Sequence, residues 1–166
     1  MATGKQLSIF NFLRMSSRIT TSGMPLKEEI PEIAGLGVES VITLVPEGVG
    51  SDLPGEAELV DAAGMRFSRI PVYWESPEID DFTDFCRIMA TNQHQKCHVH
   101  CEANMRVSVF MALYRIIVRE WTKSAAMTAV AEIWKPNETW QAYIRTILAN
   151  GAPIHAYLAD HTPKKQ

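Results

Sequence analysis

Several features are scarce in this 166-residue chain, and each scarcity excludes a class of protein. The three cysteines, Cys86, Cys97 and Cys101, are too few and too unevenly spaced for a disulfide framework, so a reducing compartment is expected. No segment is both long enough and poor enough in charge to cross a bilayer. The net charge is −3 and no lysine or arginine cluster is large enough to follow a nucleic acid. Any phosphate bound here is therefore expected to be a single group.

Targeting and repeat signals are also scarce. Residues 1–6 lack the basic start, long apolar stretch and cleavage site of a secretory signal, so a cytoplasmic location is expected. The chain has no internal repeat, and its composition, 46% hydrophobic and 21% charged, is typical of a globular protein. We therefore predict one domain over residues 1–160 and a disordered tail over 161–166.

The hydrophobic pattern predicts that strands and helices alternate. An amphipathic helix, for example, is indicated by apolar residues at i, i+3, i+4 and i+7 from Phe82. Alternating βαβ units predict an α/β fold with a mostly parallel central sheet flanked by helices. The expected strands are residues 40–45, 67–72 and 97–101. Helices are expected from Pro25, over 56–63, through 82–89 and over 107–118. Two more helices are expected after residue 118, and Asn150-Gly151 is expected to end the last one. We interpret the aromatic residues of these last helices, including Trp134 and Trp140, as core.

Residues 97–108, Cys-His-Val-His-Cys-Glu-Ala-Asn-Met-Arg-Val-Ser, combine a cysteine and an arginine between a strand and a helix. Cys101 falls at the carboxyl end of the predicted strand, where ligands bind in open α/β sheets. Backbone N–H groups of the loop and the first helical turn, with the helix dipole, would lower a thiol pKa and bind an anion. Arg106 would add a planar, permanently charged partner for an oxyanion. This strand-loop-helix segment therefore predicts an anion-binding loop for phosphoryl transfer.

At these residues the sequence resembles the protein-tyrosine and dual-specificity phosphatases, whose signature is His-Cys, five residues, Arg, then Ser or Thr. It is similar in particular to a small bacterial phosphatase-like family related to the phosphatase-like domains found beside β-lactamase-like hydrolases. The resemblance implies a phosphocysteine on Cys101, with His100 orienting the loop and Ser108 assisting as the sulfur leaves. The phosphate-binding residues would be Glu102, Ala103, Asn104, Met105 and Arg106. Supporting motifs, in order, are Phe12-Leu13-Arg14, Thr21-Ser22-Gly23-Met24-Pro25, residues 37–44, Gly64-Met65-Arg66-Phe67, Ile70-Pro71-Val72 and Val99-His100-Cys101.

The spacing of the signature leaves two alignments open. Four residues lie between Cys101 and Arg106, one fewer than in the signature, and Asn104 or Met105 stands where the family has a glycine. Pairing Cys101 with Arg106 gives a tighter loop, closer to the rhodanese sulfurtransferases, whose cysteine carries a persulfide. Matching the signature to Ser108 instead puts Val107 in the arginine position and turns Arg106 about 100° away around the helix. Asparagine tolerates the left-handed backbone that a glycine would supply.

A phosphatase also needs a general acid to protonate the leaving oxygen. The resemblance implies that this acid lies on a loop after the strand two elements upstream of the cysteine. Glu75 is nearest to that position, and a solvated loop carboxylate is the alternative interpretation of the same residue. Asp80 and Asp81 are predicted to cap the following helix.

A metal site is a rival hypothesis, because His94, Cys97, His98, His100, Cys101 and Glu102 lie in one short stretch. In a strand His98 and His100 face one side while Cys97 and Cys101 face the other, so one ion could not collect four of them. Cys97 and Cys101 lie about 13 Å apart along a strand, which is too far for a disulfide. We therefore expect no metal and no organic cofactor, a hydrogen-bonded His98, and an ordinary buried Cys86.

Together these observations predict a cysteine-dependent phosphatase that acts on a phosphorylated small molecule or a phosphoprotein, without nucleic-acid or membrane partners. Two alternatives remain. One is a sulfurtransferase that uses a Cys101 persulfide, and the other is a module that binds phosphate with little or no turnover.

Overall fold

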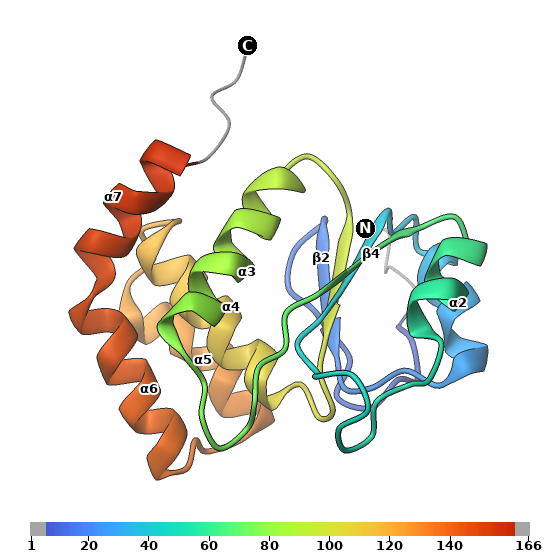
Figure 1. The fold of residues 1–166 in the computed structure, drawn as a ribbon, viewed down its shortest axis with the longest axis horizontal. Coiled ribbons are helices and arrows are strands. Elements are labelled where there is room, and N and C mark those ends of the chain that lie inside the picture. The colour runs from blue at the N-terminus through green and yellow to red at the C-terminus, as the bar shows by residue number, and fades with distance from the viewer. Residues whose placement is uncertain (1–5, 162–166) are drawn as a thin grey trace. The chain divides into compact units, whose positions relative to one another are not determined.

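A computed structural model describes residues 6–161 (Figure 1). Residues 1–5, for which we expected no secretory signal, and residues 162–166, which we expected to form a disordered tail, lie outside the described part. The described residues cluster into two compact units. Unit 1 comprises residues 6–71 and 94–104, and unit 2 comprises residues 72–93 and 105–161.

Unit 1 is built on a five-stranded sheet with the strand order β1-β2-β5-β3-β4. Strands β2, β5, β3 and β4 run parallel, and β1 pairs with β2 in the antiparallel direction. This confirms the predicted α/β fold with a mostly parallel sheet. The strands are β1 (Leu13–Arg14), β2 (Ile19–Ser22), β3 (Ser40–Thr43), β4 (Arg66–Arg69) and β5 (Cys97–His100).

The central strands β3 and β5 are buried along their whole length. Buried parallel strands are usually apolar, because no water reaches either face. Strand β5, Cys-His-Val-His, departs from this rule with two buried histidines, which therefore need partners inside the protein. Strand β4 ends at Arg69, earlier than the predicted residue 72, which agrees with the missing backbone N–H of Pro71.

Unit 1 also contains the 3₁₀ helix η1 (Lys27–Glu29) and the helices α1 (Ile30–Gly35) and α2 (Glu56–Ala62). The prediction that Pro25 opens a helix is wrong, because the chain stays extended through Leu26 and Pro31 is the proline in the first turn of α1. Helix α2 follows Gly55, whose φ of 72° is left-handed. One hydrophobic core cluster of this unit consists of Leu7, Ile9, Phe12, Ile30, Ile33, Val38, Val41, Val60 and Met65.

Unit 2 is helical. Its helices are α3 (Ile79–Thr91), α4 (Met105–Ile117), α5 (Lys123–Ile133), α6 (Glu138–Ala149) and α7 (Gly151–His161) (Figure 1). Helix α4 contacts each of the other four, and most of its residues are buried. Among residues 6–161, no helix has the length and apolar character that crossing a membrane requires.

Two predictions about the C-terminal part are wrong. The helix that carries Trp140, α6, does end at Asn150 as predicted, but it is not the last helix, because α7 begins at Gly151 directly after it. The predicted tail started at His161, but His161 is the last residue of α7. Helix α7 buries only Ile154 and Leu158, and two apolar positions four residues apart are too few for periodicity to reveal a helix.

Candidate active site

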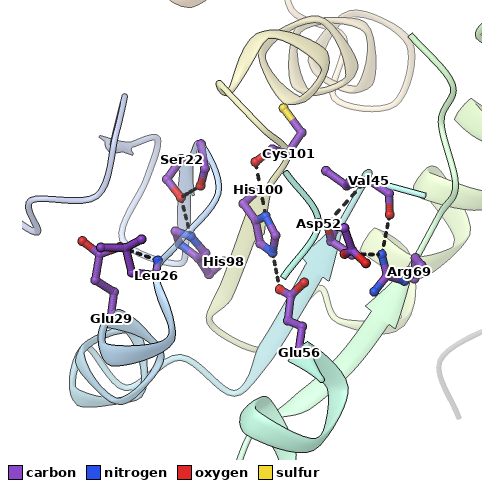
Figure 2. A network of polar contacts seen from close by, with 12 residues as sticks. Ser22, Leu26, Glu29, Val45, Asp52, Glu56, Arg69, His98, His100 and Cys101 are labelled. Atoms are coloured by element: carbon purple, nitrogen blue, oxygen red, sulfur yellow. Dashed lines mark hydrogen bonds and ion pairs between the residues drawn. The ribbon is translucent and has the colours of Figure 1, made fainter. Parts of the chain in front are cut away.

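Cys101 lies directly after β5, at the carboxyl edge of the unit 1 sheet, as predicted. The side chain is buried, with 1% of the residue exposed. Its backbone N–H donates to the carbonyl oxygen of Ser22 at the end of β2, at 3.3 Å. Cys101 and its neighbours in unit 1 are shown in Figure 2. The parallel pairing of β2 and β5 therefore fixes the peptide that carries the thiol.

The loop after Cys101 has its carbonyl groups fastened to a neighbouring segment. The carbonyl oxygen of Glu102 accepts from the Met24 N–H at 3.0 Å, and that of Ala103 accepts from the Asn11 side-chain amide at 3.0 Å. These peptides are trans, and in a trans peptide the C=O and the next N–H point in opposite directions. The Ala103 N–H therefore points away from the Met24 N–H, and the Asn104 N–H points away from the Asn11 side-chain amide. Backbone N–H groups turned to one side of a loop are what an anion-binding site requires.

Asn104 takes the left-handed conformation expected of it, with φ of 62°. Its buried side-chain amide donates to the carbonyl oxygen of Asn11 at 2.8 Å and to the Thr21 hydroxyl at 3.0 Å. Glycine is required at residue 23, because a Cβ there would lie 2.6 Å from the Glu102 carbonyl oxygen. In the sequence Gly23 stands out only within a motif, and Asn11 does not stand out at all, because its role depends on a contact 92 residues away in the chain.

The Glu102 side chain is bound to the loop between β3 and α2. Its Oε1 accepts from the Ser51 N–H at 3.0 Å. Gly50, at φ of 59°, passes so close that a Cβ on it would overlap Glu102 Oε1. A contribution of Glu102 to anion binding would therefore come from its backbone.

An ion pair holds the same loop at its other side. Arg69 donates to the Val45 carbonyl oxygen at 2.6 Å and to Asp52 at 3.1 Å (Figure 2). Burial alone would raise the pKa of Asp52, but hydrogen bonds from the Gly48 N–H and Arg69, with the Arg69 charge, outweigh it and hold that pKa below its usual value. The loop is thus tied both to β4 and to the segment after Cys101.

His100 lies between a buried carboxylate and the peptide of Cys101. Its Nε2 contacts Glu56 Oε1, and both side chains are fully buried. Its Nδ1 lies 3.4 Å from the Cys101 carbonyl oxygen (Figure 2). Glu56 does not stand out in the sequence, since a glutamate in the first turn of a helix ordinarily needs no partner. The one sequence signal for it is that two buried strand histidines need polar partners.

His98 is hydrogen-bonded, as predicted for a buried strand histidine, and both of its ring nitrogens have a partner. The Ser22 hydroxyl donates to the Gly23 carbonyl oxygen at 2.7 Å, so it accepts from His98 Nε2–H at 2.8 Å. The Thr20 hydroxyl then donates to the unprotonated Nδ1 at 2.8 Å. Burial, with the nearby His100, lowers the pKa of His98 to about 3. His98 is therefore a neutral structural residue.

The neutral His98 ring predicts a loss of stability in acid. Its pKa is about 6.5 in the unfolded chain and about 3 in the fold, so between these values only the unfolded state binds the proton. The free energy of unfolding should fall by about 1.4 kcal/mol for each unit of pH below 6.5 on this account alone. Urea denaturation at pH 7.0 and 5.0 measures the change. A His98→Gln variant should lose this contribution, whereas the exposed His94→Gln control should keep it, and equal pH dependence in all three proteins would contradict the assignment.

In unit 2, Arg106 is the second residue of α4 and is 4% exposed. Its Cζ lies 5.7 Å from the ring centroid of Trp74. Trp74 packs against Trp134 and Trp140, with ring centroids 5.3 and 5.4 Å apart, and its carbonyl oxygen accepts from Trp140 Nε1 at 3.1 Å. Trp134 and Trp140, predicted as core residues, therefore also fix the Trp74 ring that the Arg106 guanidinium covers.

Ser108 and Met105 also lie in unit 2. The Ser108 hydroxyl donates to the Met105 carbonyl oxygen at 2.7 Å and accepts from Trp134 Nε1 at 3.1 Å. The first hydrogen bond lies within α4, and the second joins α4 to Trp134 of the same unit. The proposed help of Ser108 to a leaving sulfur, and of the Met105 backbone to anion binding, stay predictions.

Glu75 is exposed, on a turn that the Ser76 N–H closes by donating to the Tyr73 carbonyl oxygen at 3.3 Å. The turn is anchored on one side by Trp74 and on the other by Glu78, whose carbonyl oxygen accepts from the Tyr143 hydroxyl at 2.8 Å. Predicted capping of α3 is confirmed for Asp81, which accepts from the Glu78 N–H at 2.8 Å. Glu75 is thus an exposed carboxylate on an anchored turn, and its role as the general acid stays a prediction.

The described residues, 6–161, contain no group of three or more His, Cys, Asp or Glu side chains that could hold a metal ion. The three cysteines are free thiols and all are buried. Burial strongly raises the pKa of Cys86, and it raises that of Cys97 to about 11 with the nearby Glu39 charge adding to the effect. Cys86 and Cys97 are therefore protonated thiols at neutral pH.

No protein-family model matches the sequence. The beta-lactamase hydrolase-like protein of Xylella fastidiosa is 32% identical over 106 residues, which are 62% of this chain and 24% of that protein. The dual specificity protein phosphatase TpbA of Pseudomonas aeruginosa is 24% identical over 119 residues, which are 70% of this chain and 51% of TpbA. The chain thus matches about a quarter of the first relative and about half of the second.

Solved structures extend the likeness to most of the chain. A structure of the "Putative phosphatase (DUF442)" of Shewanella putrefaciens has a TM-score of 0.77 at 28% identity, over 86% of this chain and 94% of that one. TpbA in complex with phosphotyrosine has a TM-score of 0.73 at 19% identity, over 95% of this chain and 98% of TpbA. The chain therefore has the fold of the cysteine-dependent protein-tyrosine and dual-specificity phosphatases, and it is similar to the DUF442 protein and to the beta-lactamase hydrolase-like protein.

Proposed function

We propose that the protein is a cysteine-dependent phosphatase that hydrolyses a phosphomonoester through a phosphocysteine intermediate. The Cys101 thiolate attacks phosphorus, and the bond from phosphorus to the ester oxygen breaks as Glu75 gives that oxygen a proton. Water then attacks the phosphocysteine, gives a proton to the Glu75 carboxylate, and releases inorganic phosphate and the thiolate. The Arg106 guanidinium and the backbone N–H groups of residues 102–106 hold the phosphoryl oxygens throughout.

The arrangement of the loop after Cys101 carries this proposal. Its Glu102 and Ala103 carbonyl groups are bound to Met24 and Asn11, so the N–H that follows each carbonyl points away from that partner, which supports a role in anion binding. A loop fixed in this way needs no rearrangement to accept an oxyanion, which is how preorganised donors stabilise a developing charge. The buried thiol at the start of the same loop supplies the nucleophile.

The substrate proposed is a phosphorylated small molecule or a phosphoprotein. TpbA, a dual specificity protein phosphatase with this fold, is seen in complex with phosphotyrosine. An aryl phosphate is therefore the first substrate to try. Arg106 matches an oxyanion better than a lysine would, because its fork donates two parallel hydrogen bonds.

Hydrolysis of an aryl phosphate by the purified protein, with and without a metal chelator, tests this function. We expect steady release of phosphate that the chelator does not change, and inhibition by orthovanadate, an oxyanion, in the assay without chelator, which would otherwise bind the vanadate. Parallel incubation with thiosulfate and cyanide tests sulfur transfer. Thiocyanate formation without phosphate release would overturn the proposal in favour of a persulfide enzyme, and phosphate binding with neither product would leave a binding module.

A further inference from the structure

The contact between Glu56 and His100 joins two elements far apart in the chain. Glu56 opens α2, and His100 ends β5, 44 residues later. Both side chains are fully buried, and within residues 6–161 the second carboxylate oxygen of Glu56, Oε2, is buried without a hydrogen-bond partner. Burying a carboxylate is costly unless a cation or several donors compensate for the lost water. His100 is the residue in contact with this carboxylate.

The two neighbours of the His100 ring indicate its protonation. Nε2 faces a carboxylate oxygen of Glu56, and Nδ1 faces the carbonyl oxygen of Cys101 at 3.4 Å. A carbonyl oxygen only accepts hydrogen bonds, and so does a carboxylate. A neutral imidazole carries one N–H, so only the imidazolium form donates to both oxygens.

The adjacent histidine provides an internal comparison. The rings of His98 and His100 lie 6.2 Å apart on the same strand, but both nitrogens of His98 face hydroxyl groups, which can donate as well as accept. His98 is therefore neutral, and Glu56 is the charged side chain that contacts His100 Nε2. The two histidines are similarly buried, so the difference in their protonation comes from the contact of His100 with Glu56.

We propose that Glu56 is a positioning residue for Cys101 that acts through His100. Glu56 holds a proton on Nε2 while the Nδ1–H of the same ring holds the Cys101 carbonyl oxygen, which fixes the peptide at the start of the anion-binding loop. The imidazolium also places a positive charge beside the residue that becomes a thiolate, and the compensating negative charge lies on the far side of the ring. This inference deepens the proposed function and rests on it for its catalytic meaning.

The rate of Cys101 alkylation by iodoacetamide between pH 5 and 10 tests the inference without any substrate. Cys86 and Cys97 stay protonated over most of this range, and peptide mass spectrometry assigns the product to Cys101. In Glu56→Gln the amide can satisfy a neutral ring, so the charge is lost while the shape is kept. We expect the midpoint of the alkylation profile to rise by about 0.5–1 pH unit. Glu58→Gln, an exposed change of the same charge two residues further along α2, should leave the midpoint unchanged.

A double-mutant cycle separates action through His100 from direct action on the thiol. In a His100→Asn background, Glu56→Gln should cause no further shift of the midpoint, because the residue through which it acts is gone. A shift that persists in that background, or a Glu56→Gln midpoint equal to that of the wild type, would overturn the inference. Thermal melting of each variant shows whether it is folded.

The wild-type protein offers a second test, which does not depend on whether the variants fold. In ¹⁵N-histidine-labelled protein at pH 7, His100 should show two N–H groups and His98 one, on Nε2. A single N–H on His100 would overturn the inference. Failure of the proposed function can be told apart from failure of this inference. If the protein did not hydrolyse aryl phosphate, the protonation of His100 and the midpoint shift would still stand. If it did hydrolyse aryl phosphate but Glu56→Gln left the midpoint unshifted, only the role of Glu56 would be lost.

Discussion

Cys101→Ser should abolish hydrolysis of an aryl phosphate, with a fall in kcat on the order of 10³-fold or more. The serine hydroxyl is similar in size but stays protonated at neutral pH and is a much weaker nucleophile than a thiolate. The backbone N–H groups of the loop remain, so the variant should still bind phosphate or orthovanadate. Phosphate release by stopped-time assay and oxyanion binding by calorimetry measure the two properties.

Cys86→Ala is the matched control for this loss. Cys86 is a buried thiol on α3 whose pKa is strongly raised by burial, so it offers no thiolate at neutral pH. The control should keep its activity within about twofold, with a lower free energy of unfolding from the lost packing. Activity that survives Cys101→Ser would show that another group carries the reaction.

Arg106→Lys should reduce kcat/KM on the order of 10²–10³-fold. Lysine keeps the positive charge but replaces a planar fork with a single ammonium group, so two parallel hydrogen bonds to one phosphoryl group are lost. The ammonium also covers the Trp74 ring less well than the guanidinium, whose Cζ lies 5.7 Å from the ring centroid. Inhibition by orthovanadate should weaken in parallel, because the same contact binds both anions.

Arg115→Lys tests whether this effect is specific to Arg106. Arg115 lies on the same helix, α4, and likewise covers an aromatic ring, that of Trp121, at 4.3 Å. The control should change kcat/KM less than about twofold. If Arg106→Lys also had so small an effect, the alignment of Cys101 with Arg106 would be wrong, and Val107 would occupy the arginine position of the signature.

The sheet could be predicted where the local pattern was strong. Strands β3 and β5 consist of buried residues, and helices lie between them in the chain. Because strands that alternate with helices pair in parallel, the parallel pairing of β3 and β5 could be predicted. Strand β1 has two residues, too few for periodicity to reveal, and β2, Ile-Thr-Thr-Ser, is partly polar. The position of Cys101 nevertheless depends on β2, because the Cys101 N–H donates to the carbonyl oxygen of Ser22.

The candidate site could be predicted where its chemistry is contiguous in the sequence. Cys101, His100 and the left-handed Asn104 lie in one short segment, so their residue types and spacing were informative. Glu56 and Trp74 could not be assigned in this way. Each acts through a neighbour brought to it by tertiary packing, Glu56 through His100 and Trp74 under Arg106. Neither contact follows from a local period or a motif.

Trapping of the phosphorylated protein tests the central claim most directly. Wild type and Glu75→Gln, in which transfer to water should be slowed, are mixed with ³²P-labelled aryl phosphate and a chelator and quenched within one turnover in denaturant at alkaline pH. Peptide fragmentation then locates the label among Cys97, His98, His100 and Cys101. The account predicts label on Cys101, more in Glu75→Gln than in the wild type, and none in Cys101→Ser. Phosphate release with no label on Cys101, or with label on a histidine, would contradict it.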